Sequence, residues 1–359
     1  MTRAFLFKSG IVCASTLIGL GLTEILFRIV PEPLYDPGEM DAGLIQYDDR
    51  LGWRHRENWQ GQHTHADFQA TYSTDARGYR KDPSPNQGPA TLVLGDSFTF
   101  GVGVSNRQTF VARLNQRFPD RRFINAGVIG YSTDQQVLHL EKIRRIQPID
   151  SILLAVYLGN DISDNARAYP LQAAQAKPFF HLNDAGELEL KNIPVPTEEN
   201  AGHLPGAYTR ELLAGVYRPS PWEKVLSHSA IWKRIDLTRK AFFGYPQLEY
   251  TDHFSYEIRL FKALLKRISG KNSQVTVLLL PGKSYVEDPR SFPAQYMEFL
   301  RNKITQLDLP PRFLLLDATE PMRLSYEANP EKLFFFPNEG HFNAAGNQWV
   351  ADFIARSGI

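Results

Sequence analysis

The feature of this sequence that most constrains its fold is a repeated alternation of apolar runs and amphipathic stretches that begins at residue 90. The runs have the length of β-strands and are rich in large apolar residues, and the segments between them have apolar residues at helical spacing. The five runs cover residues 90–97, 121–127, 151–161, 274–282 and 312–319. Because both faces of each strand would be apolar, the pattern predicts a parallel sheet with helices on both sides.

Candidate reactive residues follow several of these runs. Ser97 follows "LVLGD", Gly130 comes after the second run, and Asn160 ends the third. His341 lies in "FFFPNEGHFNAAG", just before the last amphipathic stretch. Reactive groups of parallel sheets gather at the carboxyl ends of the strands, so we expect these residues to lie close together. The set suits ester hydrolysis, which needs a serine nucleophile, a histidine base, an acid and donors for an oxyanion.

These four pieces, in this order, resemble the signature blocks of the SGNH/GDSL hydrolase superfamily. The resemblance spans roughly residues 90 to 357, apart from an insertion. It implies a three-layer α/β/α flavodoxin-like fold, in keeping with the parallel sheet. It also implies that Ser97 is the nucleophile and His341 the base. The oxyanion hole would consist of the backbone N–H groups of Ser97 and Gly130 and the side chain of Asn160.

The acid that should orient the histidine departs from the family pattern. The family usually places an aspartate three residues before the histidine, or two in some branches, and this sequence has Asn338 and Glu339 there. We expect Glu339 to accept the Nδ1–H of His341 and to stabilise the imidazolium that forms as Ser97 attacks. The alternative is a Ser–His dyad in which Asn338 is a neutral orienting group.

Each of these residues could instead have a purely structural role. Asp96 and Ser97 both suit the N-cap of a helix, Asn160 could form an Asx turn, and His341 could be a surface cap. We expect Asp96 to be structural and to orient the turn through backbone hydrogen bonds. Four ordered blocks favour the catalytic interpretation far more strongly than the tripeptide Gly-Asp-Ser alone.

Two segments accompany the hydrolase-like domain, which we place at residues 90–359. Residues 31–89 are predicted to be a stalk and a small segment with one or two strands at most. Residues 164–252, between the third and fourth strands, are rich in proline and aromatic residues and break the alternation. This insertion is a candidate lid or substrate-recognition element, or else a structural excursion. Within it, residues 179–192 are predicted to form a hairpin with its turn at residues 183–186.

Residues 1–30 have the pattern of a secretion signal. Arg3 and Lys8 precede an uncharged run over residues 9–23, and charge returns at Glu24. We expect a signal anchor or a signal peptide, with the rest of the chain outside the cytoplasm, in the periplasm if the cell is Gram-negative. The alternative is a buried amphipathic helix of the globular domain.

Composition argues against several classes of site and partner. The formal net charge is +1 and the basic residues are scattered, so no nucleic-acid partner is expected. Cys13 is the only cysteine, which excludes an intrachain disulfide and a thiolate zinc site. His63 and His65 would face the same side of a strand, but no further ligand is identifiable, and we predict a solvated surface there rather than a metal site. The glycines after Ser97 lack the Lys-Ser/Thr of a phosphate loop, and no cofactor is expected.

These features together predict a membrane-anchored or secreted serine esterase. It would remove an acyl group, with acetyl expected, from an alcohol of a carbohydrate or lipid through an acyl-serine intermediate. Aromatic residues of the insertion, such as Trp222, would suit stacking on sugars or packing in a core. One alternative is an O-acyltransferase of an exopolysaccharide pathway, in which a sugar hydroxyl resolves the acyl-serine. The other is a non-catalytic polysaccharide-binding accessory protein that has kept the fold.

Overall fold

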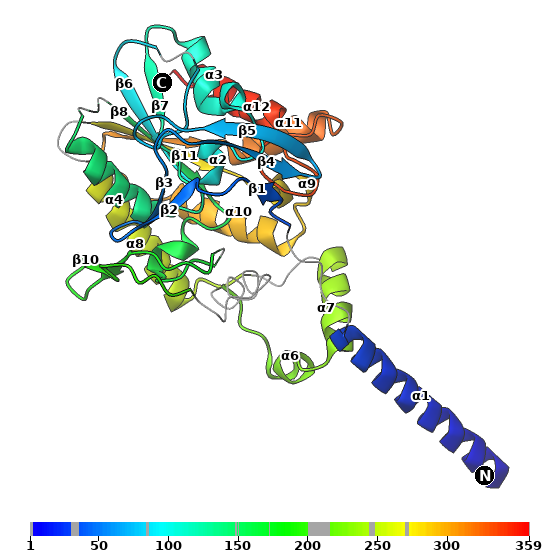
Figure 1. Ribbon diagram of the computed structural model, residues 1–359. Helices are drawn as coiled ribbons and strands as arrows, with labels where there is room; N and C mark the ends of the chain where they lie inside the picture. The colour runs from blue at the N-terminus through cyan, green and yellow to red at the C-terminus, as the bar shows by residue number, and fades with distance from the viewer. Residues whose placement is uncertain are drawn as a thin grey trace.

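A five-stranded parallel sheet forms the centre of the molecule in the computed structural model (Figure 1), in the order β12-β11-β8-β6-β7. The strands are β6 (Ala90–Leu94), β7 (Arg122–Asn125), β8 (Ser151–Tyr157), β11 (Gln274–Leu280) and β12 (Phe313–Asp317). The structure describes residues 3–29, 36–83, 86–147, 149, 151–171, 173–199, 216–243, 248–269 and 273–358. The predicted α/β fold with five parallel strands is confirmed.

Two layers of helices cover this sheet (Figure 1). On one face α3 (Phe110–Arg117) packs against α12 (Ala344–Arg356), and on the other α4 (Thr133–Arg144) packs against α8 (Asp252–Ile268). The helix α8 illustrates why these segments are helical: Thr251 caps its first turn by accepting from the N–H of Phe254, and its apolar residues recur at helical spacing and are buried. The remaining helices of this domain include α9 (Lys283–Glu287), α10 (Phe292–Ile304) and α11 (Thr319–Ala328).

The connections place the carboxyl end of β6 at a branch point of the sheet. The strand β6 pairs with β7 on one side and with β8 on the other, so the chain leaves β6 toward one edge and returns on its opposite side. Ligands of such sheets bind at this kind of switch point. The segments that directly follow β6, β7 and β8 contain Ser97, Gly130 and Asn160, respectively.

The N-terminal segment contains more strands than its sequence predicts. Five short strands form two small antiparallel sheets, with the orders β1-β4-β5 and β2-β3. They are β1 (Glu39–Met40), β2 (Ile45–Asp48), β3 (Gly52–His55), β4 (Gln60–His65) and β5 (Phe68–Ser73). The prediction of one or two strands was wrong because buried positions of these strands need not be apolar. In β4, where exposed and buried residues alternate, the buried residues are Gly61 and His63. The segment packs on the main domain through Trp59 and Tyr72, which form a cluster with Phe100.

The predicted solvated surface at His63 and His65 was also wrong. His63 is buried, with its Nδ1 2.8 Å from the Tyr72 hydroxyl and its Nε2 2.7 Å from the carbonyl oxygen of Pro37. The side chain of His65 is only 3% exposed, and its Nδ1 accepts from the N–H of Asp67. Both rings therefore hold the fold of the β4–β5 hairpin. Among the residues that the structure describes, no group of three potential ligands could hold a metal ion.

The insertion between β8 and β11 contains two separate parts within its described residues. The first includes η2 (Ser163–Ala166) and a hairpin of β9 (Phe179–Leu182) and β10 (Leu188–Lys191), which confirms the predicted hairpin. The second consists of α6 (Pro221–Leu226) and α7 (Ala230–Phe243). Phe180 of the hairpin is fully buried, whereas Trp222 of α6 is 76% exposed.

A buried ion pair ties the first part of the insertion to the main domain. The Nζ of Lys177 contacts the carboxylate of Asp134 at the start of α4, and both side chains are fully buried. Asp134 also accepts from the hydroxyl of Ser132 at 2.7 Å. Burial raises the pKa of Asp134, and the neighbouring Lys177 opposes that shift.

Replacing Lys177 with methionine should destabilise the protein strongly. The variant would leave Asp134 buried without its cation, which typically costs about 3–5 kcal/mol. The matched control is Lys142→Met, because Lys142 pairs with Asp48 at 3.3 Å but is 58% exposed, and such pairs contribute about 0–1 kcal/mol. The free energy of unfolding of both variants is measured by chemical denaturation of the full chain in detergent, monitored by circular dichroism. Equal denaturation midpoints for the two variants would contradict the stabilising role that we assign to the buried pair of Lys177 and Asp134.

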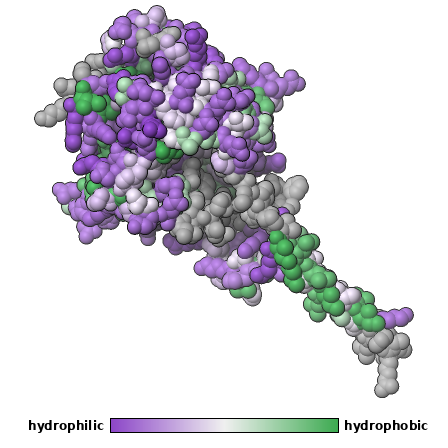
Figure 2. All heavy atoms as spheres, viewed as in Figure 1, coloured by the Kyte–Doolittle hydropathy of each residue, from purple (hydrophilic) through white to green (hydrophobic). Residues whose placement is uncertain are grey.

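The N-terminal helix α1 (Arg3–Ile29) extends away from the rest of the molecule (Figure 1). Its stretch Lys8–Ile29 has a mean hydropathy of 1.8 and no residue buried within the structure, so it has the length and composition of a membrane-crossing helix. In Figure 2 this helix presents a continuous hydrophobic surface. The alternative of a buried helix in the globular domain was therefore wrong.

Candidate active site

Ser97 is the first residue of a one-turn helix directly after the central strand β6. This helix, α2 (Ser97–Phe100), is capped by Asp96, whose carboxylate accepts from the N–H of Phe98 at 2.9 Å. The prediction that Asp96 orients the turn is confirmed. A Cβ at Gly95 would lie 2.1 Å from the hydroxyl of Thr99, so the tight turn requires glycine there. Burial raises the pKa of Asp96 to about 6.

Three side chains form a continuous hydrogen-bonded chain at this turn. The Oγ of Ser97 lies 2.7 Å from Nε2 of His341, and Nδ1 of His341 lies 2.5 Å from Oε1 of Glu339. The other carboxylate oxygen of Glu339 accepts from the backbone N–H of His341 at 2.9 Å. An ionised Glu339 can only accept, so Nδ1 carries the proton and Nε2 is free to accept from the Ser97 hydroxyl. Glu339 is buried at 5% exposure.

A short tight loop before α12 presents the histidine. The N–H of Phe336 donates to the carbonyl of His341 at 2.9 Å, and Phe335 pairs with Phe342 in an antiparallel bridge. Asn343 then caps α12 by accepting from the N–H groups at the start of that helix. The loop is thus held at both ends, and Glu339 and His341 lie between these two sets of bonds.

Asn338 does not orient the histidine and instead binds the N-terminal segment. Its backbone N–H and its side-chain amide both donate to the carboxylate of Asp67, at 2.6 and 2.7 Å. The same carboxylate accepts from the backbone N–H of Glu339 at 3.0 Å. These bonds lower the pKa of Asp67, although desolvation opposes them. Asp67 lies in the turn between β4 and β5, so the N-terminal segment supports the loop that contains Glu339.

Gly130 and Asn160 lie in the loops after β7 and β8, at the same edge of the sheet as Ser97. Gly130 has a φ of +80°, which favours glycine, and a Cβ there would come within 3.2 Å of the Trp53 ring. Asn160 is buried, and its Nδ2 donates to Asp164 at a long 3.5 Å. Its Oδ1 has no hydrogen-bond partner in the described part of the chain. Their roles as oxyanion donors stay a prediction.

The loop after β7 is bonded directly to the turn that contains Ser97. The N–H of Val128 donates to the carbonyl of Gly95 at 3.1 Å, and the side chain of Asn125 donates to the carbonyl of Thr99 at 2.8 Å. Trp53 of the N-terminal segment donates to the carbonyl of Ile129 at 2.8 Å. The segment that contains Gly130 is therefore fixed from both sides.

Arg80 holds the chain that follows α2. Its guanidinium donates to the carbonyl of Val104 and to the side chain of Asn106, each at 2.7 Å, and lies over the ring of Tyr72 at 4.3 Å. Arg80 is buried, and burial lowers its pKa to about 9. This arginine belongs to the N-terminal segment. That segment therefore supports both the turn that contains Ser97, called the serine turn below, and the loop that contains Glu339.

Buried carboxyl groups lie behind the serine turn. Burial raises the pKa of Asp161 well above its ordinary value, and the nearby Asp96 adds to that shift. Burial likewise raises the pKa of Asp164 to about 6. Tyr157 stacks on Phe98 with ring centroids 4.3 Å apart, and the ring of Phe98 lies 4.7 Å from that of His341. The turn that contains Ser97 thus rests on a desolvated base of aromatic rings and buried carboxyl groups.

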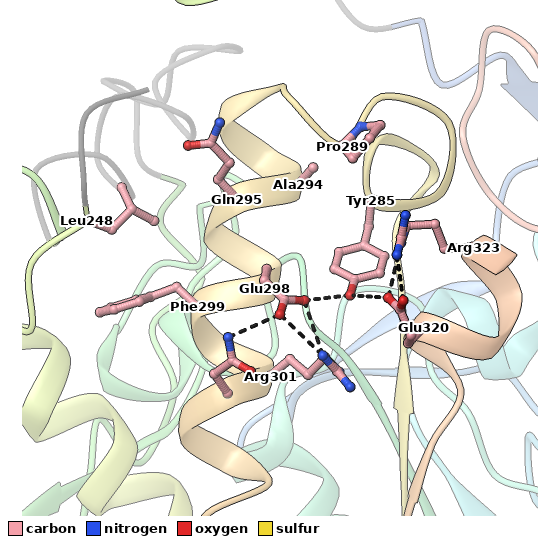
Figure 3. Close-up of a pocket in the computed structure, with 11 residues that line it drawn as sticks. Leu248, Tyr285, Pro289, Ala294, Gln295, Glu298, Phe299, Arg301, Glu320 and Arg323 are labelled. Atoms are coloured by element: carbon pink, nitrogen blue, oxygen red, sulfur yellow. Dashed lines mark hydrogen bonds and ion pairs between the residues drawn. The ribbon is translucent and has the colours of Figure 1, made fainter. Parts of the chain in front are cut away.

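A surface pocket of about 680 Å³ lies elsewhere, between α9, α10 and α11 (Figure 3). Its charged side chains are paired with one another: Glu298 accepts from Tyr285 at 2.5 Å and lies 3.2 Å from Arg301, and Arg323 pairs with Glu320. None of the residues that line it belongs to the Ser97 site. This pocket is therefore not part of the candidate active site.

The sequence matches the GDSL-like lipase/acylhydrolase family over residues 93–349. The chain belongs to this family. The matched stretch contains Ser97, Gly130, Asn160 and His341, at the positions where the structure has the serine turn, two neighbouring strand ends and the last loop. Membership makes the protein an ester hydrolase of the SGNH type, with the parallel sheet of that fold.

Several solved structures are similar to this GDSL-like hydrolase. A lipolytic protein of the G-D-S-L family from Veillonella parvula is 12% identical with a TM-score of 0.41, covering 75% of this chain and 97% of that chain. An acetyl xylan esterase is 15% identical with a TM-score of 0.43, covering 75% and 100%. A catalytic mutant of an acetylxylan esterase from Geobacillus stearothermophilus is 14% identical with a TM-score of 0.38, covering 76% and 96%. At such values the likeness says nothing about the substrate. No curated protein matches the sequence.

Proposed function

We propose that this GDSL-like hydrolase is an extracytoplasmic serine esterase that removes an acetyl group from an alcohol of a carbohydrate or lipid. The observation that carries the proposal is the unbroken chain of hydrogen bonds from Ser97 through His341 to Glu339. Such a chain lets a weak nucleophile lose its proton as it attacks, and it supplies a buried charge for the imidazolium that results.

In the first half of the reaction, Ser97 attacks the ester. Its Oγ bonds to the carbonyl carbon while its proton passes to Nε2 of His341, 2.7 Å away. The carbonyl π electrons move onto oxygen, which becomes an oxyanion. The donors proposed for it are the backbone N–H groups of Ser97 and Gly130 and the Asn160 amide. His341 then protonates the leaving alcohol as the ester C–O bond breaks, which leaves an acyl-serine.

In the second half, water releases the acyl group. His341 takes a proton from the water as its oxygen attacks the acyl carbon, and a second oxyanion forms at the same donors. The bond to Ser97 Oγ breaks, and His341 returns its proton to that oxygen. Glu339 stays ionised throughout and stabilises the imidazolium in each half-reaction.

Aromatic packing holds the nucleophile and the base in one unit. Phe98 follows Ser97 directly, and its ring contacts those of Tyr157 and His341. The acyl group that we propose for this site is acetyl, which is smaller than a long fatty acyl chain.

The helix α1 supports the proposed location. Its apolar stretch Lys8–Ile29 is exposed and long enough to cross a bilayer, and the positive residues Arg3 and Lys8 lie at its N-terminal end. This arrangement is compatible with a signal anchor or a signal peptide. With the N-terminus inside, the catalytic domain would lie outside the cytoplasm.

The alternative of a non-catalytic accessory protein loses its support in this geometry. That interpretation depended on the missing aspartate, and Glu339 occupies the place of the acid with a 2.5 Å contact to His341. The O-acyltransferase uses the same residues and differs only in the acceptor of the acyl group. It is therefore an outcome of the experiment below.

The test uses full-length protein in detergent with p-nitrophenyl acetate and its octanoate analogue, beside a serine-directed fluorophosphonate. We expect turnover of the acetate ester in preference to the octanoate, and a phosphonate adduct on the peptide that contains Ser97. Absence of both turnover and adduct would contradict the proposal. Adding an oligosaccharide acceptor measures partition of the acyl group. Transfer to sugar that exceeds release to water would instead assign the acyltransferase activity.

Asp67 should act as a positioning residue for this reaction. Asp67→Ala removes the acceptor for the backbone N–H groups of Asn338 and Glu339, so Glu339 would no longer be fixed against His341. Because small misplacements of catalytic groups are costly, we expect kcat to fall about 10- to 100-fold with KM little changed. Steady-state kinetics of Asp67→Ala in the wild-type and Glu339→Gln backgrounds measure the effect.

The two backgrounds separate a positioning role from a general loss of structure. If Asp67 acts through Glu339, the substitution should cost little further activity once Glu339 is already glutamine. The matched control is Asn338→Ala, which removes one side-chain bond to Asp67 and leaves both backbone bonds in place. Equal losses of kcat in both backgrounds would show that Asp67 does not act through the acid.

A further inference from the structure

The second part of the insertion is attached to the last turns of the apolar helix α1. The carboxylate of Glu24 accepts from the N–H of Ala230 at 2.7 Å, from the N–H of Ile231 at 3.0 Å and from the hydroxyl of Ser229 at 2.8 Å. These are the groups at the start of α7. A carboxylate inside an apolar helix is costly in a bilayer unless it is paired, and the insertion supplies its partners.

Two basic residues strengthen this attachment. Arg28, one turn after Glu24, pairs with it at 2.8 Å and donates to the carbonyl of His228 at 2.9 Å. Arg234 of α7 lies over the ring of Phe27 at 5.3 Å. Figure 1 shows α7 beside the end of α1, with α6 next to it. The end of α1 and the start of α7 therefore form one unit.

The position of Glu24 gives the depth of α7 relative to a bilayer. Counted from Arg3, where α1 begins, Glu24 ends 22 residues of helix, about 33 Å, close to the ~30 Å hydrocarbon core. Glu24 is also the first charged residue after Lys8, so it would lie at the boundary with the headgroups. The start of α7, bonded to Glu24, would lie at the same level.

The neighbouring helix α6 has the side chains that suit this level. Trp222, Val225 and Leu226 are 76%, 63% and 38% exposed. They are three and four residues apart, so they share one helix face. Ser220 and Glu223 form a capping box that fixes this short helix. Tryptophan concentrates at membrane–water boundaries, where its ring is buried and its N–H stays near water.

We propose that the α6–α7 segment of the insertion is a membrane-contact element, with the Trp222, Val225 and Leu226 face of α6 seated in the headgroup region of the bilayer that α1 crosses. Exposure alone does not carry this inference. The bonds of Glu24 hold the start of α7, and α6 ends only four residues before it. This places α6 close to the point where the apolar helix leaves the membrane and identifies a lipid surface as the partner. The two contacts, α1 and α6, would together restrict how the catalytic domain can tilt over the membrane.

The test uses the full chain in phosphatidylcholine vesicles that contain some phosphatidylglycerol. Lipids brominated near the headgroup quench tryptophan fluorescence at that depth. The helix α1 contains no tryptophan, so quenching reports the other parts of the chain. Trp232 lies in the first turn of α7, so the measurement is made in a Trp232→Phe background. In that background we expect quenching, and loss of most of it when Trp222→Phe is added. The matched control Trp349→Phe, which removes a partly buried ring of α12, should keep it.

A parallel probe checks whether α1 has entered the bilayer. Cys13 is the only cysteine and lies exposed on α1, so an environment-sensitive fluorophore attached there reports that helix alone. A blue-shifted emission at Cys13, with tryptophan quenching that Trp222→Phe does not change, would overturn the proposal. Absence of that emission shift would overturn it as well, since the depth of α6 is derived from α1. Neither result depends on esterase activity.

Discussion

Replacing Ser97 with alanine should reduce kcat for p-nitrophenyl acetate by about four to six orders of magnitude, to the level left by binding and oxyanion donors alone. The hydroxyl is the group that would bond to the ester carbon, and the nearest base lies 2.7 Å from it. Without the hydroxyl, His341 could at best activate water that nothing positions. Steady-state kinetics with a matched phosphonate-labelling assay measure the loss.

The control for this variant is a serine in the same stretch that the mechanism does not use. Ser105 belongs to a capping box with Gln108 at the start of η1 (Asn106–Gln108), eight residues after Ser97. Ser105→Ala should cost about 0.5–2 kcal/mol of stability, as the loss of caps does, and leave kcat unchanged. A Ser97→Ala variant that kept the turnover of Ser105→Ala would remove Ser97 from the mechanism.

Replacing Glu339 with glutamine should lower kcat by about 10³- to 10⁴-fold with little effect on KM. Glutamine has nearly the same shape, but it is neutral and offers donors as well as an acceptor. The imidazolium of His341 would lose a buried charge that lies 2.5 Å from Nδ1, and the tautomer with the proton on Nδ1 would no longer be enforced. The substitution should therefore slow the chemical step and leave substrate binding nearly unchanged.

Asn338→Ala distinguishes this triad from a Ser–His dyad. If Asn338 were the orienting group, its loss would cost as much as that of Glu339. In the structure its amide donates to Asp67, not to the histidine, so we expect a much smaller effect. The ratio of kcat for Asn338→Ala and Glu339→Gln, measured under one set of conditions, decides between them.

The parallel sheet could be predicted because its strands are buried on both faces. Runs such as Ser151–Tyr157 are apolar without alternation, and helical spacing separates them, so sequence alone shows the order of strands and helices. The same order put Ser97 at a strand end. Glu339 was also predictable, since a carboxylate two residues before His341 can reach Nδ1 with ordinary side-chain geometry.

The residues that hold the candidate active site in place could not be predicted in the same way. Asp67 and Arg80 act through bonds to residues far along the chain, and nothing in their local sequence indicates a partner. His63 and His65 looked solvated because their strand is short and polar, and they are buried by contacts within the N-terminal segment, such as those with Tyr72 and Phe68. The docking of Glu24 onto α7 spans 206 residues for its shortest bond. Local periodicity contains no information about such contacts.

The contact between Asp67 and Asn338 has a consequence for the biosynthesis of the enzyme. The two residues are 271 positions apart, and the histidine follows only three residues after Asn338. Synthesis proceeds from the N-terminus, so a nascent chain has its serine turn and the hairpin with Asp67 long before the acid and the base leave the ribosome. On the proposed mechanism, a nascent chain could not cleave esters before residue 341 has left the ribosome.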